Sequence, residues 1–236
     1  MTPETEDLVR SATRWAAVPF VPEVTLLTAA EPFALWDRTA CDAPPFWAFP
    51  WAGGQGLARY VLDHPETVAG RAVLDVASGS GLVAIAAAKA GARSVLAGDI
   101  DDNALAAIAL NAAANAVPAV LPRRTDLAVG PDLASPVGCA SCSDCASPAG
   151  CASPAGCAGG ADVVLAADVF YQRDLATMAL RFLRAARQRG ADVLAADPGR
   201  AFVPRESLTA LATYQVPVLT VLEDVPVKEV TVYRLR

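Results

Sequence analysis

The sequence lacks the marks of a membrane-spanning, secreted or nucleic-acid-binding chain. Its longest apolar stretches, such as residues 82–88, stop at a charge or a glycine well short of the roughly 18 residues that a membrane span needs. It begins MTPETED, which is acidic where a signal peptide is basic and then apolar, so we expect a cytoplasmic protein. Nineteen basic residues against 25 acidic ones leave a net charge of −6. That balance disfavours binding to nucleic acid, which requires clustered lysine and arginine, and favours a partner that displays lysines.

Charged residues make up only 19% of the chain and hydrophobic residues 54%, which excludes an intrinsically disordered protein. The length of 236 residues allows one substantial core or two small ones. Histidine occurs once, as His64 before Pro65, where a surface cap is a simpler role than a catalytic base.

Cysteine is concentrated in one segment, because five of the six cysteines lie between Cys139 and Cys157. A six-residue unit of the form ASPAGC is written there four times, and this repeat accounts for every one of the five except Cys142. The spacing of Cys139, Cys142 and Cys145 would also suit a thiolate-bound metal. No histidine is near, and proline and glycine recur without apolar periodicity, so we interpret residues 134–160 as a low-complexity insert and expect no metal.

The rest of the chain alternates strand and helix patterns, which predicts an α/β fold built on a parallel sheet with helices on both faces. We expect strands at 72–75, 94–99, 119–121, 161–166, 191–196, 216–221 and 229–235, and helices at 4–16, 55–62, 82–89, 102–114, 174–188 and 207–214. The last two strands have no helix between them and should pair antiparallel at an edge. Residues 1–65 are interpreted as an N-terminal extension packed on a domain formed by residues 66–236.

The strongest local motif is the run VLDVASGSGLVA at residues 73–84, where the first predicted strand meets its helix. Gly79 and Gly81 allow a tight turn and a close approach of the backbone to a ligand. Asp99 ends the next strand, 18 residues after Gly81, where a carboxylate can accept both hydroxyls of a ribose. The pattern therefore predicts a nucleoside site on a Rossmann-like sheet.

Two observations favour S-adenosylmethionine over a nicotinamide cofactor as the ligand. Asp75 stands four residues before Gly79, beside the expected cationic end of the ligand. A carboxylate there suits amino and sulfonium groups and would repel a pyrophosphate. The chain also ends soon after the predicted sheet, which leaves no room for a separate substrate domain. Both observations predict a methyltransferase.

Three further motifs occur in a fixed order: WAGGQ at 51–55, DVFY at 168–171 and DPGR at 197–200. Together with the glycine motif, they resemble the seven-stranded protein-lysine methyltransferases, and most of all the electron transfer flavoprotein β-subunit lysine methyltransferase family. The resemblance runs from about residue 36 to the C-terminus and is interrupted by the cysteine repeat. It implies a Rossmann-like class I methyltransferase sheet of seven strands, S-adenosylmethionine as donor and lysine side chains of a flavoprotein subunit as acceptors.

The resemblance also assigns site residues by position. Trp51 and Gln55 should form a wall of the cofactor pocket, and Asp126 is a weaker candidate for the adenine edge. Asp75, Gly79 and Gly81 should contact the methionine part of the donor and Asp99 its ribose. Alternative roles remain for two of these residues, since Trp51 could be a core aromatic and Asp126 an ordinary loop acid.

Asp168 and Tyr171 are the predicted catalytic residues, opposite the methyl group. A lysine with a pKa near 10.4 is only about 0.1% neutral at pH 7.4, a deficit of about 4 kcal/mol before its nitrogen can attack. A dry pocket lowers that pKa, and the two side chains would hold and orient the nitrogen. Asp168 could instead be a helix cap and Tyr171 a packing residue. The DPGR motif after the fifth strand should shape the acceptor entrance, where Arg200 could contact the substrate or be an ordinary surface arginine.

The leading hypothesis is thus an S-adenosylmethionine-dependent protein-lysine N-methyltransferase. A methyltransferase for a small amine or heterocycle would use the same pocket. A cofactor-binding adaptor without activity and a nicotinamide dehydrogenase are weaker alternatives.

Overall fold

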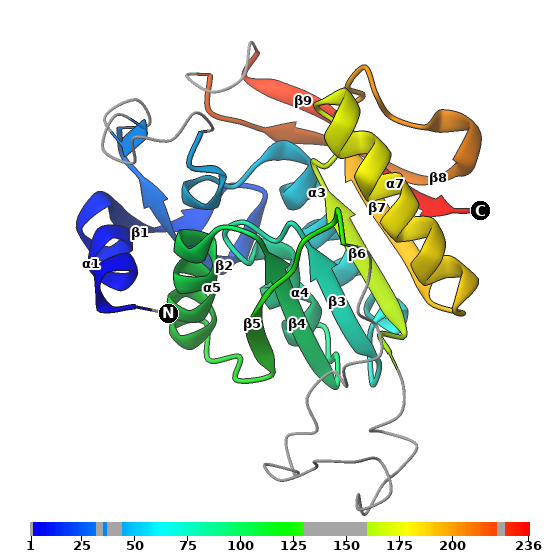
Figure 1. The fold of residues 1–236 in the computed structure, drawn as a ribbon. Coiled ribbons are helices and arrows are strands. Elements are labelled where there is room, and N and C mark those ends of the chain that lie inside the picture. The colour runs from blue at the N-terminus through cyan, green and yellow to red at the C-terminus, as the bar shows by residue number, and fades with distance from the viewer. Residues whose placement is uncertain (1, 32–34, 37–43, 130–159, 221–224) are drawn as a thin grey trace, which may run out of the picture.

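The fold is described from a computed structural model that covers residues 2–31, 35–36, 44–129, 160–220 and 225–236. A seven-stranded sheet forms its centre (Figure 1). The strands are β3 (Ala72–Val76), β4 (Ser94–Asp99), β5 (Val120–Arg124), β6 (Val163–Ala167), β7 (Asp192–Asp197), β8 (Leu208–Pro217) and β9 (Val227–Leu235). Their order in space is β5-β4-β3-β6-β7-β9-β8, with β3 to β7 parallel and β9 antiparallel to both of its neighbours. The predicted α/β class and the antiparallel edge pair are confirmed.

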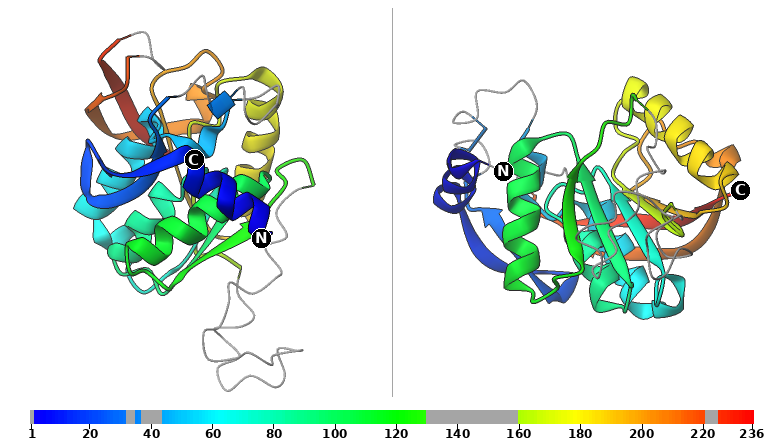
Figure 2. Two further views of the ribbon diagram at one scale, coloured as in Figure 1. Left: turned by 90° about the vertical axis from the view of Figure 1, so that its left-hand side faces the viewer. Right: turned by 60° about the horizontal axis from the view of Figure 1, so that its bottom comes forward.

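Two helical layers cover this sheet, as the turned views in Figure 2 show. The helices are α1 (Pro3–Ala12), α3 (Ala52–Asp63), α4 (Leu82–Lys89), α5 (Asp102–Ala114) and α7 (Arg173–Gln188). Successive residues of a strand point to opposite faces. Val73 therefore packs in the core under α3 and α4, and its neighbour Leu74 packs in a second core under α7. The strands in the centre are almost wholly apolar because both of their faces are buried.

The sheet order places the site. Because β4 follows β3 on one side and β6 lies on the other, the chain reverses direction across the sheet between β3 and β6. Ligands of open α/β sheets bind at the carboxyl ends of the strands at such a switch point. The glycine motif leaves β3 there, and the DVFY motif follows β6.

The N-terminal segment differs from the predicted helix over 4–16. Helix α1 ends at Ala12, and the chain turns into a hairpin of β1 (Thr13–Val18) and β2 (Val21–Ala29). Both faces of β2 are buried along its second half, with Val24 and Leu26 in the core shared with α3 and α4 and Leu27 and Ala29 in a separate cluster with α1 and α5. The hairpin was missed because β1 is exposed over most of its length and carries a weak strand pattern.

The predicted helix over 207–214 is wrong. These residues form most of β8, which pairs along its length with β9. Alanine and leucine favour a helix in isolation, but the ladder of hydrogen bonds to β9 outweighs that preference. The expected strand over 216–221 is the end of this same β8, which stops at Pro217. The helices over 82–89 and 102–114 and the strand over 94–99 have the predicted bounds.

Two predictions concern residues outside the described part of the chain. Residues 134–159 of the cysteine repeat lie outside it, and so does Cys41. Among the residues that are described, no group of three or more histidines, cysteines or acids could hold a metal ion. None of the helices in the same residues is long and apolar enough to cross a membrane.

Candidate active site

The glycine turn after β3 forms the floor of the site. Gly79 and Gly81 have φ angles of 56° and 82°, in the left-handed region that glycine adopts without strain. The N–H of Gly79 donates to Oδ2 of Asp99 at 2.8 Å, which ties the turn to the end of β4. Gly81 is the N-cap of α4, so this helix points its N-terminus toward the turn. The turn and the strand-end acid thus form one hydrogen-bonded unit.

Asp75 is a buried carboxylate below this turn. Its Oδ2 accepts a hydrogen bond from the Ser78 hydroxyl at 2.5 Å and another from the Ala84 N–H at 3.1 Å. Burial raises the pKa of the Asp75 carboxyl to about 7, against these two hydrogen bonds, which lower it. None of the ion pairs found among the described residues supplies Asp75 with a cation. A ligand cation beside Asp75 would therefore stabilise its charged form.

Asp99 ends β4 beside the turn. Its Oδ1 accepts from the Asp101 N–H at 3.1 Å and its Oδ2 accepts from Gly79. Burial raises the pKa of the Asp99 carboxyl, although these N–H groups lower it. Each carboxylate oxygen can accept a second hydrogen bond. Two vicinal hydroxyls of a ribose match that remaining capacity.

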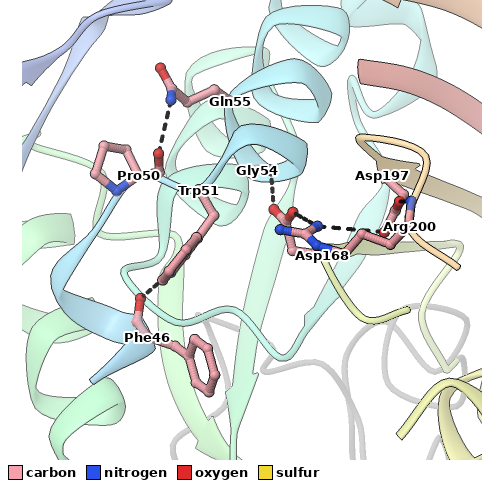
Figure 3. A network of polar contacts seen from close by, with 8 residues as sticks. All are labelled: Phe46, Pro50, Trp51, Gly54, Gln55, Asp168, Asp197 and Arg200. Carbon is pink, nitrogen blue, oxygen red and sulfur yellow. Dashed lines mark hydrogen bonds and ion pairs between the residues drawn. The ribbon is translucent and has the colours of Figure 1, made fainter. Parts of the chain in front are cut away.

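Asp168 lies across the cavity, at the residue that follows β6. Its φ angle of 57° is unusual for a residue with a side chain and costs of order 1 kcal/mol. Oδ2 accepts from the Gly54 N–H at 2.8 Å, and Oδ1 accepts from Nη1 of Arg200 at 2.5 Å (Figure 3). Strained backbone of this kind occurs where the surroundings hold a functional group in place.

The first turn of α3 approaches Asp168 closely. A Cβ on Gly53 would lie 2.7 Å from Asp168 Oδ2 and 2.8 Å from the carbonyl oxygen of Ala196. The WAGGQ motif therefore places a glycine where no side chain fits and, one residue later, the N–H that holds Asp168.

Aromatic side chains form one wall of the site. Trp51 donates its Nε1–H to the carbonyl oxygen of Phe46 at 2.9 Å (Figure 3). Its ring lies against the rings of Phe46 and Phe49. The Phe46 ring also contacts Tyr171, with 5.4 Å between ring centroids. Burial raises the pKa of the Tyr171 phenol. The wall thus extends from the α3 cap to the residue three after Asp168.

These groups surround one cavity of about 720 Å³, which is in the size range of small-molecule sites. Seven of the predicted site residues line it: Trp51, Asp75, Gly79, Asp99, Asp126, Asp168 and Tyr171. The structure thus brings together side chains from four strand ends and from the segment before α3.

Gln55 and Gly81 are not among the lining residues. The Gln55 side chain points away from Asp168 (Figure 3) and is buried, with its amide donating to the carbonyl oxygens of Pro50 and Pro217 and accepting from the Phe20 N–H. This placement does not match the predicted wall of the pocket. Gln55 instead ties the N-terminal segment and β8 to α3.

Several lining residues were not expected from the sequence. Phe46 was part of the segment that carried the resemblance, but nothing in the sequence indicated that it would connect Trp51 to Tyr171. Leu175 and Met178 reach the cavity from α7, and only the tertiary packing of that helix brings them there. Arg200, a guessed contact, lines the cavity and pairs with Asp168.

The site fits S-adenosylmethionine on its own chemistry. The buried carboxyl of Asp75 suits the donor's cationic groups, Asp99 has acceptors for a ribose, and the glycine turn leaves room for the backbone to approach. The fold and this site are those of a class I S-adenosylmethionine-dependent methyltransferase.

The comparisons with known proteins agree with this class. The profile of the family "Ribosomal protein L11 methyltransferase (PrmA)" matches residues 60–129. Among solved structures, TrmN from Thermus thermophilus is 21% identical, with a TM-score of 0.51 over 76% of this chain and 48% of that one. A Thermoplasma acidophilum protein is 16% identical, with a TM-score of 0.50 over 78% of this chain and 87% of that one. At such identities the likeness concerns the fold.

Curated relatives name the family. The electron transfer flavoprotein beta subunit lysine methyltransferase of Danio rerio is 34% identical over 204 residues, which are 83% of this chain and 69% of that protein. The chain belongs to the electron transfer flavoprotein β-subunit lysine methyltransferase family. The Rattus norvegicus and Homo sapiens relatives are 44% and 49% identical over 97 and 82 residues. Those matches span 38% and 31% of the relatives' own lengths.

Proposed function

We propose that the protein transfers a methyl group from S-adenosylmethionine to lysine side chains of a protein, with the β-subunit of electron transfer flavoprotein as the candidate acceptor. The observation that supports the proposal is one cavity that gathers both sets of residues. Asp75, Gly79 and Asp99, which suit a nucleoside, line it together with Asp168 and Tyr171, and the Tyr171 ring lies against the aromatic wall. The names of the relatives support lysine as the acceptor. The cytoplasmic location stays a prediction.

Each proposed residue has a role that follows from its placement. Asp75 would face the donor's cationic groups, Gly79 and Gly81 would shape the turn around them, and Asp99 would hold the ribose. Trp51 would close one side of the cavity, and Asp126 would border the adenine.

When bound, S-adenosylmethionine would supply the methyl group: the lone pair of a neutral amine attacks the methyl carbon in line, the N–C bond forms, and the C–S bond breaks with its electron pair left on sulfur. Asp168 would accept an N–H of that amine and so aim its lone pair. Tyr171 and the aromatic wall would exclude water, which favours the neutral amine over the ammonium. The proton that the ammonium must lose goes to solvent.

Donor binding is tested first by thermal shift. S-adenosylmethionine and S-adenosylhomocysteine should both raise the melting temperature, and Asp99→Ala should weaken both effects. Stabilisation by NAD alone would contradict the methyltransferase assignment.

Methyl transfer is tested with labelled donor and purified electron transfer flavoprotein β-subunit. We expect label on lysine, and Asp168→Ala should retain donor binding but lose about 100-fold or more in turnover. Asp174→Ala is the matched control, because this acid is exposed on the first turn of α7. Label on free small amines but on no protein lysine would favour the small-molecule alternative.

A further inference from the structure

The carboxylate expected to receive the substrate amine already has a cationic partner. Arg200 Nη1 lies 2.5 Å from Asp168 Oδ1 and 3.6 Å from Asp197 Oδ2. The Arg200 backbone N–H donates to Asp197 Oδ1 at 2.7 Å, so the loop after β7 presents the guanidinium to Asp168 (Figure 3). The side chains of Asp168 and Arg200 are 14% and 23% exposed, and that of Asp197 is fully buried. Because water is largely excluded, this ion pair is weakly screened.

Arg200 therefore changes what Asp168 can do. Among the described residues that line the cavity, Arg200 is the only one with a positive charge. A lysine ammonium entering this end would meet a carboxylate whose charge is compensated and a guanidinium of its own sign. Like charge at short range favours the neutral form of an amine. The lone pair of that neutral form is what the reaction requires.

The other charged and titratable groups around the cavity are acids and one phenol. The acids that line it are Asp75 on β3, Asp99 ending β4, Asp101 capping α5 and Asp126 after β5; the phenol is that of Tyr171 after β6, and Asp197, which ends β7, lies outside the lining. Asp75 and Asp99 are hydrogen-bonded to the glycine turn and the start of α4, where the donor's own cation would face them. Asp197 is buried beneath Arg200, and α7 contributes the apolar Leu175 and Met178.

We propose that Arg200 is a positioning residue that selects the neutral form of the acceptor amine, an inference that rests on the proposed function. Arg200 and the Gly54 N–H together hold Asp168 in one orientation. The positive charge of Arg200 also reduces the extent to which Asp168 can stabilise a lysine ammonium. Asp168 then serves as a hydrogen-bond acceptor for an amine N–H rather than as a counterion.

The pH profile of methyl transfer tests this proposal. In Arg200→Gln, the uncompensated Asp168 should stabilise the ammonium, so the rising limb of kcat should move up by about one pH unit. That shift means an about tenfold lower kcat near pH 7, approaching the wild-type value at high pH. The KM for the lysine acceptor should not rise, because binding of the ammonium is retained or improved.

Two further variants separate charge from structure. Arg200→Lys retains the charge but not the planar fork, and its limb should lie near the wild-type position even if kcat is lower. Arg205→Gln, an exposed cation in η4 (Arg205–Ser207), should leave the profile unchanged. A uniformly lower profile in Arg200→Gln, or the same shift in Arg200→Lys, would overturn the proposal.

A binding measurement tests Arg200 without any methyl transfer. S-adenosylmethionine carries a positive sulfur and S-adenosylhomocysteine a neutral one. Without the guanidinium, the site should bind the positively charged donor relatively more tightly. The dissociation constant of S-adenosylmethionine divided by that of S-adenosylhomocysteine should therefore fall about threefold or more in Arg200→Gln. An unchanged ratio would contradict the proposed charge effect of Arg200. A wild-type protein that binds the donor but labels no amine would instead reject the proposed function.

Discussion

Gly53 and Asp168 show how little space separates α3 from the end of β6. The hydrogen bond from the Gly54 N–H to Asp168 requires this approach, and a Cβ at position 53 would overlap two oxygens. One of them is a backbone carbonyl that cannot rotate away. The constraint on residue 53 therefore comes from the proposed catalytic carboxylate and its strand end rather than from helix formation.

Gly53→Ala should displace Asp168, with an about tenfold or larger loss of kcat and a lower melting temperature. Gly54→Ala is the matched control for stability, since its Cβ would meet neighbours only at 3.8 Å and beyond. Its melting temperature should equal that of the wild type. A fully active Gly53→Ala protein would show that the position of Asp168 is not critical.

Asp75 makes stability depend on pH. Burial raises the pKa of its carboxyl from the usual 3.8 to about 7 in the folded protein, so the folded state holds a proton that the unfolded state has lost. The free energy of unfolding should therefore fall as pH rises from about 4 to about 7. Asp75→Asn removes this titration, so its melting temperature should gain on that of the wild type between about pH 5 and about pH 8. A difference that is constant over this range would contradict the assignment.

Helix α5 acts as a clamp at the scale of elements. Asn111 accepts from the Leu27 N–H of β2 at 2.8 Å and donates to the Ser80 carbonyl of the glycine turn at 2.8 Å. Asn115, one helical turn later, bonds both the N–H and the carbonyl of Thr25. The two asparagine side chains thus bond backbone groups of β2 that a neighbouring strand would otherwise bond. Asn111 also connects β2 to the glycine turn.

Asn111→Ala should leave the Leu27 N–H and the Ser80 carbonyl buried without a partner. At about 1 to 3 kcal/mol for each of the two groups, the free energy of unfolding should fall by about 2 to 6 kcal/mol in urea titrations. Affinity for S-adenosylhomocysteine should also fall, because the turn loses an anchor. Ala113→Ser, exposed on the same helix, should change the free energy by less than about 0.5 kcal/mol. A loss no larger than this control would show that the clamp is dispensable.

At the scale of the whole molecule, the strands that flank the cysteine repeat are hydrogen-bonded to other strands of the sheet. Strand β5 pairs with β4, and β6 pairs with β3 and β7, all within the described residues. Deleting residues 134–160 and joining the ends with a short linker should therefore leave melting temperature and donor affinity nearly unchanged. Failure of that protein to fold, or zinc or iron in the purified full chain, would show that the repeat has a structural role.

The sequence was most informative where a local rule and the global fold agree. Asp101 caps α5, and Gly79 and Gly81 occupy two of the three left-handed positions of the turn after β3, so the bounds of these elements could be predicted. Residues 207–214 show the opposite case, because a weak helix preference gave way to pairing with β9, which no local pattern reports.

The sequence by itself determined the fold class, the glycine turn with Asp99, and the order of motifs that indicates the family, because each depends on residues close together in the chain. The tertiary structure alone decided that Gln55 is a tie rather than a lining residue, that Phe46 joins Trp51 to Tyr171, and that Arg200 pairs with Asp168. These contacts join residues up to 162 positions apart, and their geometry is set by how the strand ends meet.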